Sequence, residues 1–220
     1  MPGKATITLA LPKGRVLRAV LPLMKRAGIS PGPGFADEDD RRLRFSTNLP
    51  GVEIVRVRSF DVATFVAFGA AELGVAGSDV LAEFEYPEIY APVDLRVGRC
   101  RLVVAEPAAM SRDDDPQRWS HIRVATKYPQ LTRRHFAERG VQAECIRLSG
   151  AVELAPGLDL CRRIVDLVET GSTLKANGLV EVEQIAEVTS RLAVNRTALK
   201  TRPEELMGWI EKFRKAADDA

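Results

Sequence analysis

Short apolar runs alternate with amphipathic helical patterns along most of the chain. Each apolar run is bounded by polar or glycine-rich positions, which is typical of a short buried strand. The residues from Gly14 to Arg26 place apolar side chains on one face at helical spacing. The runs predict strands at Thr6–Leu11, Val52–Val57, Leu73–Ala76, Arg101–Ala105, Ile122–Ala125, Glu144–Leu148, Ile164–Val168 and Arg191–Asn195, and the helical patterns predict helices at Gly14–Arg26, Asp61–Ala70, Leu131–Arg139 and from Pro203 onward.

This order of elements predicts an α/β protein with parallel sheets covered by helices. The nearly continuous apolar run Ile164–Val168 favours a parallel strand buried on both faces. Two α/β lobes are expected, with a boundary near Val97, because the turn-like stretch Tyr86–Asp94 precedes it and contains two prolines. Loops are expected at Ser30–Asp40 and Asp113–Gln117. The sequence shows no internal repeat of 20–50 residues.

Composition narrows the class of protein. The 220 residues carry 32 basic and 30 acidic side chains, so the balance gives no reason to expect nucleic acid as a partner. Three cysteines without a C-x-x-C pair argue against disulfides and zinc, and two histidines nearly exclude a histidine-rich metal site. The apolar run at the N-terminus is too short for a signal peptide, and no stretch is long enough to span a membrane. We therefore expect a cytoplasmic protein.

The most informative segment joins the strand Ile164–Val168 to the start of a helix. Thr170, Gly171, Ser172 and Thr173 occupy this junction, where a glycine allows close backbone approach and Ser172 or Thr173 can cap the helix. Free N–H groups and the positive end of the helix dipole suit a phosphate at such a place. The chain has neither a Walker A ending nor a G-x-G-x-x-G motif, which weakens the P-loop and Rossmann alternatives.

Two carboxylates accompany this junction. Asp166 interrupts the apolar strand and Glu169 stands at its end. Two acids beside an anion are repulsive unless hydroxyl groups lie between them, and sugar hydroxyls donate hydrogen bonds to carboxylates. The combination therefore indicates a ribose 5-phosphate site. The structural alternative is an ordinary helix cap, with Asp166 in an internal hydrogen bond.

Five segments together resemble the ATP phosphoribosyltransferase family. The stretch Asp166–Leu179 resembles its phosphoribosyl pyrophosphate signature, and the other segments occur in the family's order. They are Leu9–Arg15, Glu72–Leu81, Arg123–Tyr128 and Leu148–Pro156. The acids Asp166 and Glu169 are spaced differently from the adjacent acids of the more common phosphoribosyltransferases, so the resemblance does not divide their roles.

The resemblance implies a two-lobed fold like that of type II periplasmic binding proteins, with the active site between the lobes. It implies that residues 1–96 and 189–220 form lobe I and that residues 97–188 form lobe II, which carries the phosphoribosyl pyrophosphate loop. Only one helix is expected after Arg191–Asn195, so no regulatory domain follows and the chain resembles the short form of the family. That form implies a homodimer that joins a separate subunit resembling histidyl-tRNA synthetase in a hetero-oligomer.

The implied reaction transfers the 5-phosphoribosyl group from phosphoribosyl pyrophosphate to N1 of ATP, the first step of histidine biosynthesis. Arg15 and Arg41 are the candidate catalytic residues, acting on the pyrophosphate together with Mg²⁺, which we expect substrate oxygens rather than a protein cage to hold. Lys13, Gly14 and Asp79 are candidates for the nucleotide site. Without the family, Arg15 suits a solvated helix, Arg41 a charged surface and Asp79 a helix cap equally well.

Lys127, Tyr128 and Glu153 are weaker candidates for the same cleft. Two other functions compete with this interpretation. One is a solute-binding or ligand-sensing module of the same two-lobed fold, since fold alone does not fix function. The other is a phosphoribosyltransferase that acts on a free base. The phosphate loop opposes the first alternative, and the five ordered segments oppose the second.

Overall fold

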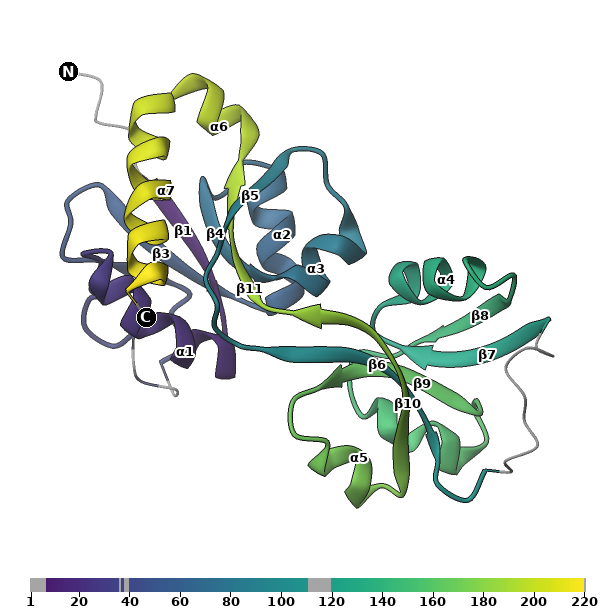
Figure 1. Ribbon diagram of the computed structural model, residues 1–220. Coiled ribbons are helices and arrows are strands. Elements are labelled where there is room, and N and C mark those ends of the chain that lie inside the picture. The colour runs from purple at the N-terminus through teal and green to yellow at the C-terminus, as the bar shows by residue number, and fades with distance from the viewer. Residues whose placement is uncertain (1–6, 36, 38–39, 111–119, 220) are drawn as a thin grey trace. The chain divides into compact units, whose positions relative to one another are not determined.

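The computed structural model describes residues 7–35, 37, 40–110 and 120–219 (Figure 1). The chain forms two compact units, one of residues 1–98 and 189–220 and the other of residues 99–188. The first unit is therefore discontinuous, and the chain passes between the units at two points. The expected loop Asp113–Gln117 and the start of the first strand at Thr6 lie outside the described residues.

The first unit contains a six-stranded sheet in the order β2-β3-β1-β4-β11-β5. Strand β1 is central and pairs in parallel with β3 and β4, while β2 and β11 run in the opposite direction. Because β5 is antiparallel to β11, it runs with β4, so four of the six strands share one direction. The strands are β1 (Ile7–Pro12), β2 (Arg44–Ser46), β3 (Val52–Val57), β4 (Leu73–Gly77), β5 (Ile89–Asp94) and β11 (Ser190–Asn195).

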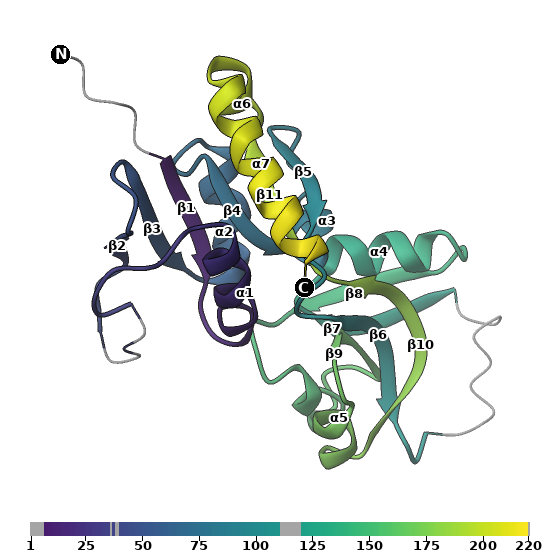
Figure 2. The ribbon, with the colours of Figure 1, turned by 60° about the vertical axis from the view of Figure 1, so that its left-hand side comes forward.

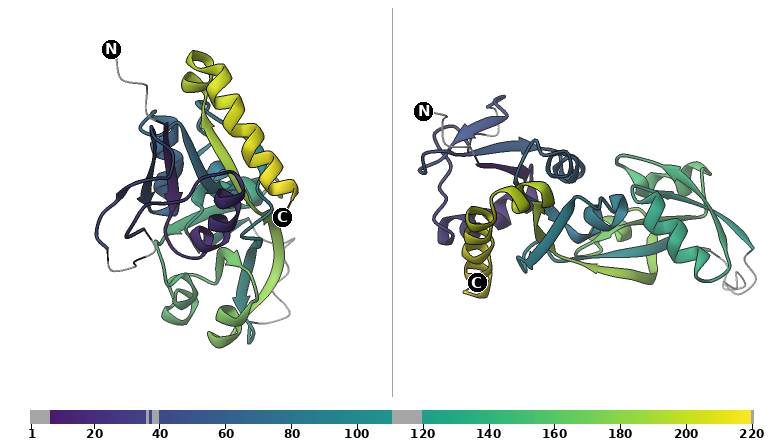
Figure 3. Two further views of the ribbon diagram at one scale, coloured as in Figure 1. Left: turned by 90° about the vertical axis from the view of Figure 1, so that its left-hand side faces the viewer. Right: turned by 90° about the horizontal axis from the view of Figure 1, so that it is seen from above.

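Helices cover both faces of this sheet (Figure 2). Helices α1 (Arg15–Arg26) and α7 (Pro203–Asp218) contribute apolar side chains to the larger core cluster. The other face packs against α2 (Ser59–Ala67), and α3 (Ser78–Phe84) follows β4. The short α6 (Arg196–Thr201) precedes α7, which is seen side-on in the left view of Figure 3.

The second unit contains a five-stranded sheet in the order β10-β6-β9-β7-β8. Strands β9, β7 and β8 are parallel neighbours, whereas β6 is antiparallel to both β9 and β10, so four of the five strands again share one direction. The strands are β6 (Cys100–Pro107), β7 (His121–Thr126), β8 (Gln142–Arg147), β9 (Arg163–Val168) and β10 (Leu179–Val188).

Helix α5 (Ser172–Ala176) and the 3₁₀ turn η2 (Val152–Leu154) share one apolar cluster with this sheet, and a second 3₁₀ turn, η3 (Pro156–Leu158), follows η2. Helix α4 (Pro129–Ala137) covers the opposite face, where its His135 contacts Glu183 of β10 at 3.1 Å. The α/β class with two mainly parallel sheets is confirmed. In the described part of the chain, no helix is both long and apolar enough to cross a membrane.

Five elements depart from the sequence prediction. The stretch Tyr86–Asp94 was expected to be a turn, but most of it forms β5, an edge strand that tolerates Pro92 because one side of an edge needs no N–H donor. The alternating Val and Glu residues of β10 also form an edge strand, with two irregularities in its register. Two helices rather than one follow β11, because the Asn195 side chain caps α6 by accepting from Ala198 N at 2.7 Å. The short elements β2 and α3 were not predicted either.

Candidate active site

The candidate phosphate loop, the segment Thr170–Thr173, lies at the junction of β9 and α5 in the second unit. Gly171 adopts φ 77° and ψ 0°, a left-handed conformation that favours glycine. On either side of it, Thr170 Oγ1 and Ser172 Oγ lie 3.0 Å apart, and the Ser172 N–H donates to Thr170 Oγ1 at 3.4 Å. Thr170, Ser172 and Thr173 are exposed. The loop therefore presents hydroxyl groups and the first N–H groups of a helix on one turn.

The helix cap differs from the sequence prediction. Gly171 occupies the N-cap position, and its carbonyl oxygen accepts from Lys175 N at 3.0 Å. Ser172 and Thr173 are the first residues inside α5 and neither caps it. The left-handed glycine turns the chain directly into the helix, so no side-chain cap is formed.

The two carboxylates differ in their surroundings. Asp166 is half-buried, and its Oδ1 accepts from the N–H of Leu167 at 2.8 Å. By the two-residue period of a strand, its side chain lies on the same sheet face as Ile164 and Val168, which belong to the cluster that packs under α5. Glu169 is exposed at the end of the strand. Asp166 thus has an internal hydrogen bond, as the structural alternative expected, and also lies on the face that carries the loop.

The neighbouring strand brings a second set of candidates to the same edge. Strand β7 is parallel to β9, with Thr126 opposite Val165, so Lys127 and the phosphate loop both follow carboxyl ends. Tyr128 is buried, and its N–H donates to Thr126 Oγ1 at 2.9 Å, which fixes the turn into α4. Glu153 lies in η2, which follows β8.

The first unit has an equivalent edge at the carboxyl ends of β1, β3 and β4. Lys13 and Arg15 follow β1 and are exposed, and the Lys13 N–H donates to the carbonyl oxygen of Val57 at 3.0 Å. Gly14 adopts φ 83° and ψ −142°, a region that is almost restricted to glycine. This conformation turns the strand into α1 and places Arg15 at the first helical position.

Asp79 lies at the same edge, because β4 is parallel to β1. Gly77 rather than Asp79 is the N-cap of α3, so Asp79 lies in the first turn. Its carboxylate is 6% exposed and folds back over Gly77, where a Cβ would collide with Oδ1. A buried carboxylate at a helix N-terminus is stabilised by the helix dipole.

Arg41 reaches this edge through an irregular loop. Strand β2 is antiparallel to β3, and the Arg56 N–H donates to the carbonyl oxygen of Leu43 at 2.7 Å. Residues before Leu43 therefore run towards the carboxyl end of β3. Arg41 is exposed there, and Asp40 beside it is held by Arg42, whose hydrogen bonds keep the pKa of Asp40 below its ordinary value.

Two residues of this edge were not among the sequence candidates. Arg58 follows β3 directly and is the exposed N-cap of α2, so it shares the carboxyl edge with Lys13 and Arg15. Its position between a strand and a helix is the signal that could have identified it. Arg56 is 6% exposed, and its guanidinium donates to four carbonyl oxygens of the loop before β2. That role depends on distant contacts and has no local signal.

The described residues contain no cluster of three or more His, Cys, Asp or Glu side chains that could hold a metal ion. Mg²⁺ does not need such a cluster, because it commonly binds one or two carboxylates of the protein together with substrate phosphates and waters.

A model of the ATP phosphoribosyltransferase family matches residues 58–215 of the chain. The ATP phosphoribosyltransferase of Rhodospirillum rubrum is 68% identical over 216 residues, which cover 98% of this chain and 95% of the relative. That of Paramagnetospirillum magneticum is 69% identical over 210 residues, which cover 96% of each protein.

Two solved structures are similar to the whole chain. The ATP phosphoribosyl transferase (HisG:HisZ) complex from Thermotoga maritima has a chain that matches with a TM-score of 0.81 at 30% identity, covering 98% of this chain and 100% of that one. The periplasmic aliphatic sulphonate binding protein SsuA from Escherichia coli matches with a TM-score of 0.59 at 11% identity, covering 98% of this chain and 69% of that one. The latter likeness concerns the fold alone and agrees with the expected type II periplasmic binding protein fold.

Proposed function

Because the chain belongs to the ATP phosphoribosyltransferase family, we propose that the phosphate loop of its second unit binds phosphoribosyl pyrophosphate and that cations of its first unit act on the leaving pyrophosphate. The activity of the family is the first step of histidine biosynthesis. The 5-phosphoribosyl group passes from phosphoribosyl pyrophosphate to N1 of ATP, and the products are phosphoribosyl-ATP and pyrophosphate.

The observation that carries the proposal is the left-handed Gly171 between two hydroxyl residues at the start of α5. A phosphate here receives donors from the first turn of the helix and from Thr170, Ser172 and Thr173. Since a side chain at position 171 would stand where the ligand approaches, the site needs glycine for both its backbone conformation and its space.

Asp166 and Glu169 serve the ribose in this proposal. A ribose hydroxyl donates to a carboxylate, and a carboxylate near the ring stabilises the positive charge that develops at C1 as the bond to pyrophosphate breaks. Exposed Glu169 is the more accessible of the two acids, whereas half-buried Asp166 already accepts a main-chain N–H.

Arg15 and Arg41 are assigned to the pyrophosphate, and Lys13, Gly14 and Asp79 to the nucleotide. The reaction forms the bond from adenine N1 to ribose C1 and breaks the bond from C1 to the pyrophosphate oxygen. N1 has a lone pair at neutral pH, so the protein need not supply a nucleophile or accept a proton before attack. The guanidinium groups therefore stabilise negative charge on the leaving oxygen, which is greatest as that bond breaks.

Mg²⁺ is the proposed cofactor, held mainly by the oxygens of the substrate. When bound, it neutralises charge on the leaving pyrophosphate. The relatives are bacterial biosynthetic enzymes, and this likeness supports a cytoplasmic location for the chain.

The proposed assembly is a homodimer that binds a regulatory subunit resembling histidyl-tRNA synthetase. The likeness to a chain of the HisG:HisZ complex over nearly the whole length of both chains supports the second subunit of this assembly. An effector that binds the second subunit can alter catalysis only if it binds more tightly when this chain is in one conformational state than when it is in another.

The experiment is an absorbance assay for phosphoribosyl-ATP with ATP, phosphoribosyl pyrophosphate and Mg²⁺, run with and without the partner subunit. Product should require both substrates and should be lost in the Gly171→Val variant. Full activity in that variant would show that the assigned loop does not bind the phosphoribosyl group.

A further inference from the structure

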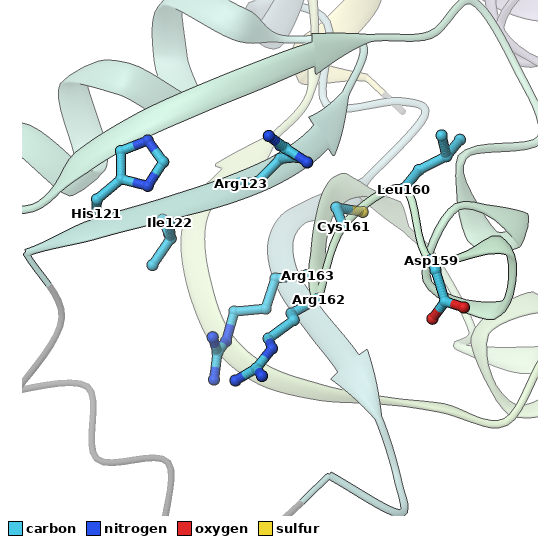
Figure 4. Close-up of a pocket in the computed structure, with 8 residues that line it drawn as sticks. All are labelled: His121, Ile122, Arg123, Asp159, Leu160, Cys161, Arg162 and Arg163. Atoms are coloured by element: carbon cyan, nitrogen blue, oxygen red, sulfur yellow. The ribbon is translucent and has the colours of Figure 1, made fainter.

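The second unit contains a cavity whose lining includes none of the residues assigned to the phosphoribosyl transfer (Figure 4). Its volume is about 490 Å³, within the range of small-molecule sites. One wall comes from the first residues of β7 and the other from the segment that leads into β9. The lining residues are His121, Ile122, Arg123, Asp159, Leu160, Cys161, Arg162 and Arg163.

The cavity and the phosphate loop lie at opposite ends of the same strand. Strand β9 begins at Arg163, in the cavity wall, and ends at Val168, just before the loop. Six residues at about 3.3 Å each separate the two ends by about 17–20 Å. The cavity is therefore distinct from the loop assigned to phosphoribosyl pyrophosphate.

Basic side chains dominate the polar lining. Arg163 is 3% exposed and is held by Glu106 at 2.9 Å, which fixes a cation in the wall. Arg123 donates through Nε to Glu144 at 2.9 Å, an interaction that uses one of the five N–H donors of a guanidinium. Arg162 is exposed and forms no ion pair with an acid in the described part of the chain. Figure 4 shows the guanidinium groups of Arg162 and Arg163 pointing the same way.

The remainder of the lining is largely apolar. Ile122 and Cys161 are buried, whereas Leu160 is exposed at the rim. Burial also raises the pKa of the Cys161 thiol, so this sulfur is neutral at physiological pH and adds no negative charge. Asp159 is the one acid among the described lining residues. A guanidinium pair beside an apolar wall suits a small organic molecule that carries an anionic group.

We propose that this cavity is a second phosphate-binding site, for a small phosphate monoester whose organic part lies against Ile122 and Leu160. A phosphate has three terminal oxygens and accepts from several directions, so it suits the two neighbouring guanidinium groups of Arg162 and Arg163 better than a single carboxylate does. Arg162 contacts the phosphate, and Arg163, oriented by Glu106, supports it from the wall.

The two histidines of the chain provide a readout specific to this site. His121 lines the cavity, whereas His135 is buried against Glu183 on the face covered by α4. Inorganic phosphate is titrated into the full-length protein at constant pH and ionic strength, with chloride as the balancing anion. The imidazole proton resonances are followed by NMR. The chemical shift of the His121 resonance should change with phosphate concentration until it saturates, and the chemical shift of the His135 resonance should not change.

Three variants complete the test. Arg162→Gln should raise the half-saturating phosphate concentration about tenfold or more, because a hydrogen bond from a charged group is lost. Arg133→Gln, which removes an exposed arginine of α4 outside the cavity, should leave it unchanged. Gly171→Val should also leave the His121 response unchanged, which separates this site from the phosphate loop.

Several results would overturn the proposal. They are a His121 resonance that does not respond to phosphate or responds equally to chloride, a response that survives intact in Arg162→Gln, and one that disappears in Gly171→Val. Acetate that saturates the His121 response at a lower concentration than phosphate would assign the cavity to carboxylates instead.

Discussion

The guanidinium of Arg56 donates a hydrogen bond of 2.5 Å to the carbonyl oxygen of Asp40, the residue immediately before Arg41. The same guanidinium donates to the carbonyl oxygens of Phe35, Asp37 and Arg42, and it lies over the rings of Phe35 and Phe45 at 5.9 and 5.0 Å. A buried arginine on β3 thus fixes the loop that carries a candidate catalytic arginine.

We predict that Arg56→Met lowers kcat through Arg41 and also destabilises the fold. Carbonyl oxygens left without a donor cost about 1–3 kcal/mol in the free energy of unfolding. If Arg56 acts only by holding the loop, adding Arg56→Met to Arg41→Ala should lower kcat little further. Urea unfolding and steady-state kinetics on the two single variants and the double variant measure both effects. If the double variant instead lost kcat by the product of the two single losses, Arg56 and Arg41 would act independently.

Arg15→Ala and Arg41→Ala should each lower kcat by about 10²–10³-fold, as the loss of an oxyanion donor does. The matched control is Lys25→Ala, which removes an exposed cation from the last turn of α1, about 15 Å along the helix from Arg15. Steady-state kinetics decide each residue separately. If a variant keeps the wild-type kcat, the substituted arginine does not act in the site. An equal loss of kcat in Lys25→Ala would indicate a general charge effect.

Acid should destabilise the first unit partly through Glu53. Hydrogen bonds from Arg44 chiefly, and also from Thr8, lower the pKa of this carboxyl below the ordinary value of 4.5. A lowered pKa means that the stabilisation is present above pH 4.5 and is lost as the pH falls through the folded-state pKa. Unfolding measured between neutral pH and pH 3 should therefore show a smaller fall in stability for Glu53→Gln than for the wild type. An identical pH dependence in the two proteins would contradict this cause.

Histidine should inhibit the complex with the regulatory subunit much more than it inhibits this chain alone. The basis for this prediction is the likeness to a chain of the HisG:HisZ complex, which covers nearly the whole length of both chains. Inhibition curves for the chain with and without its partner measure the difference. Equal and strong inhibition in both would place the histidine site on this chain.

Local signals predicted the elements that hold the phosphate loop. The apolar run Ile164–Val168 and the glycine at 171 are adjacent in sequence, and the strand and the turn each follow from a few residues. The N-cap is Gly171 rather than Ser172 or Thr173, because propensity favours a hydroxyl residue at the N-cap and does not show that this glycine is left-handed.

Long-range contacts account for what the sequence did not reveal. Arg56 donates hydrogen bonds to carbonyl oxygens of residues that lie 14–21 positions earlier in the chain. In the sequence it is only a polar residue within the strand Val52–Val57, so nothing local marks this role. Similarly, Arg162 and Arg163 form a pair of charges that is typical of a solvated surface, yet Arg163 is buried beside Glu106 of β6. Strand β10 was not predicted because its alternation of apolar and polar residues breaks at Gln184, in the part of the strand where its register with β6 is irregular.

Calorimetry with phosphoribosyl pyrophosphate on Gly171→Val tests the central assignment most directly. A Cβ at position 171 would meet nothing closer than Val168 Cγ1 at 3.9 Å, so loss of binding would come from the left-handed backbone and the obstructed phosphate rather than from a collision of the Cβ with the core. Gly140→Val is the matched control, because Gly140 also has a positive φ, 72°, and lies beyond the end of α4. Binding should disappear in Gly171→Val and persist in Gly140→Val. Unchanged affinity in Gly171→Val would show that this loop does not bind phosphoribosyl pyrophosphate.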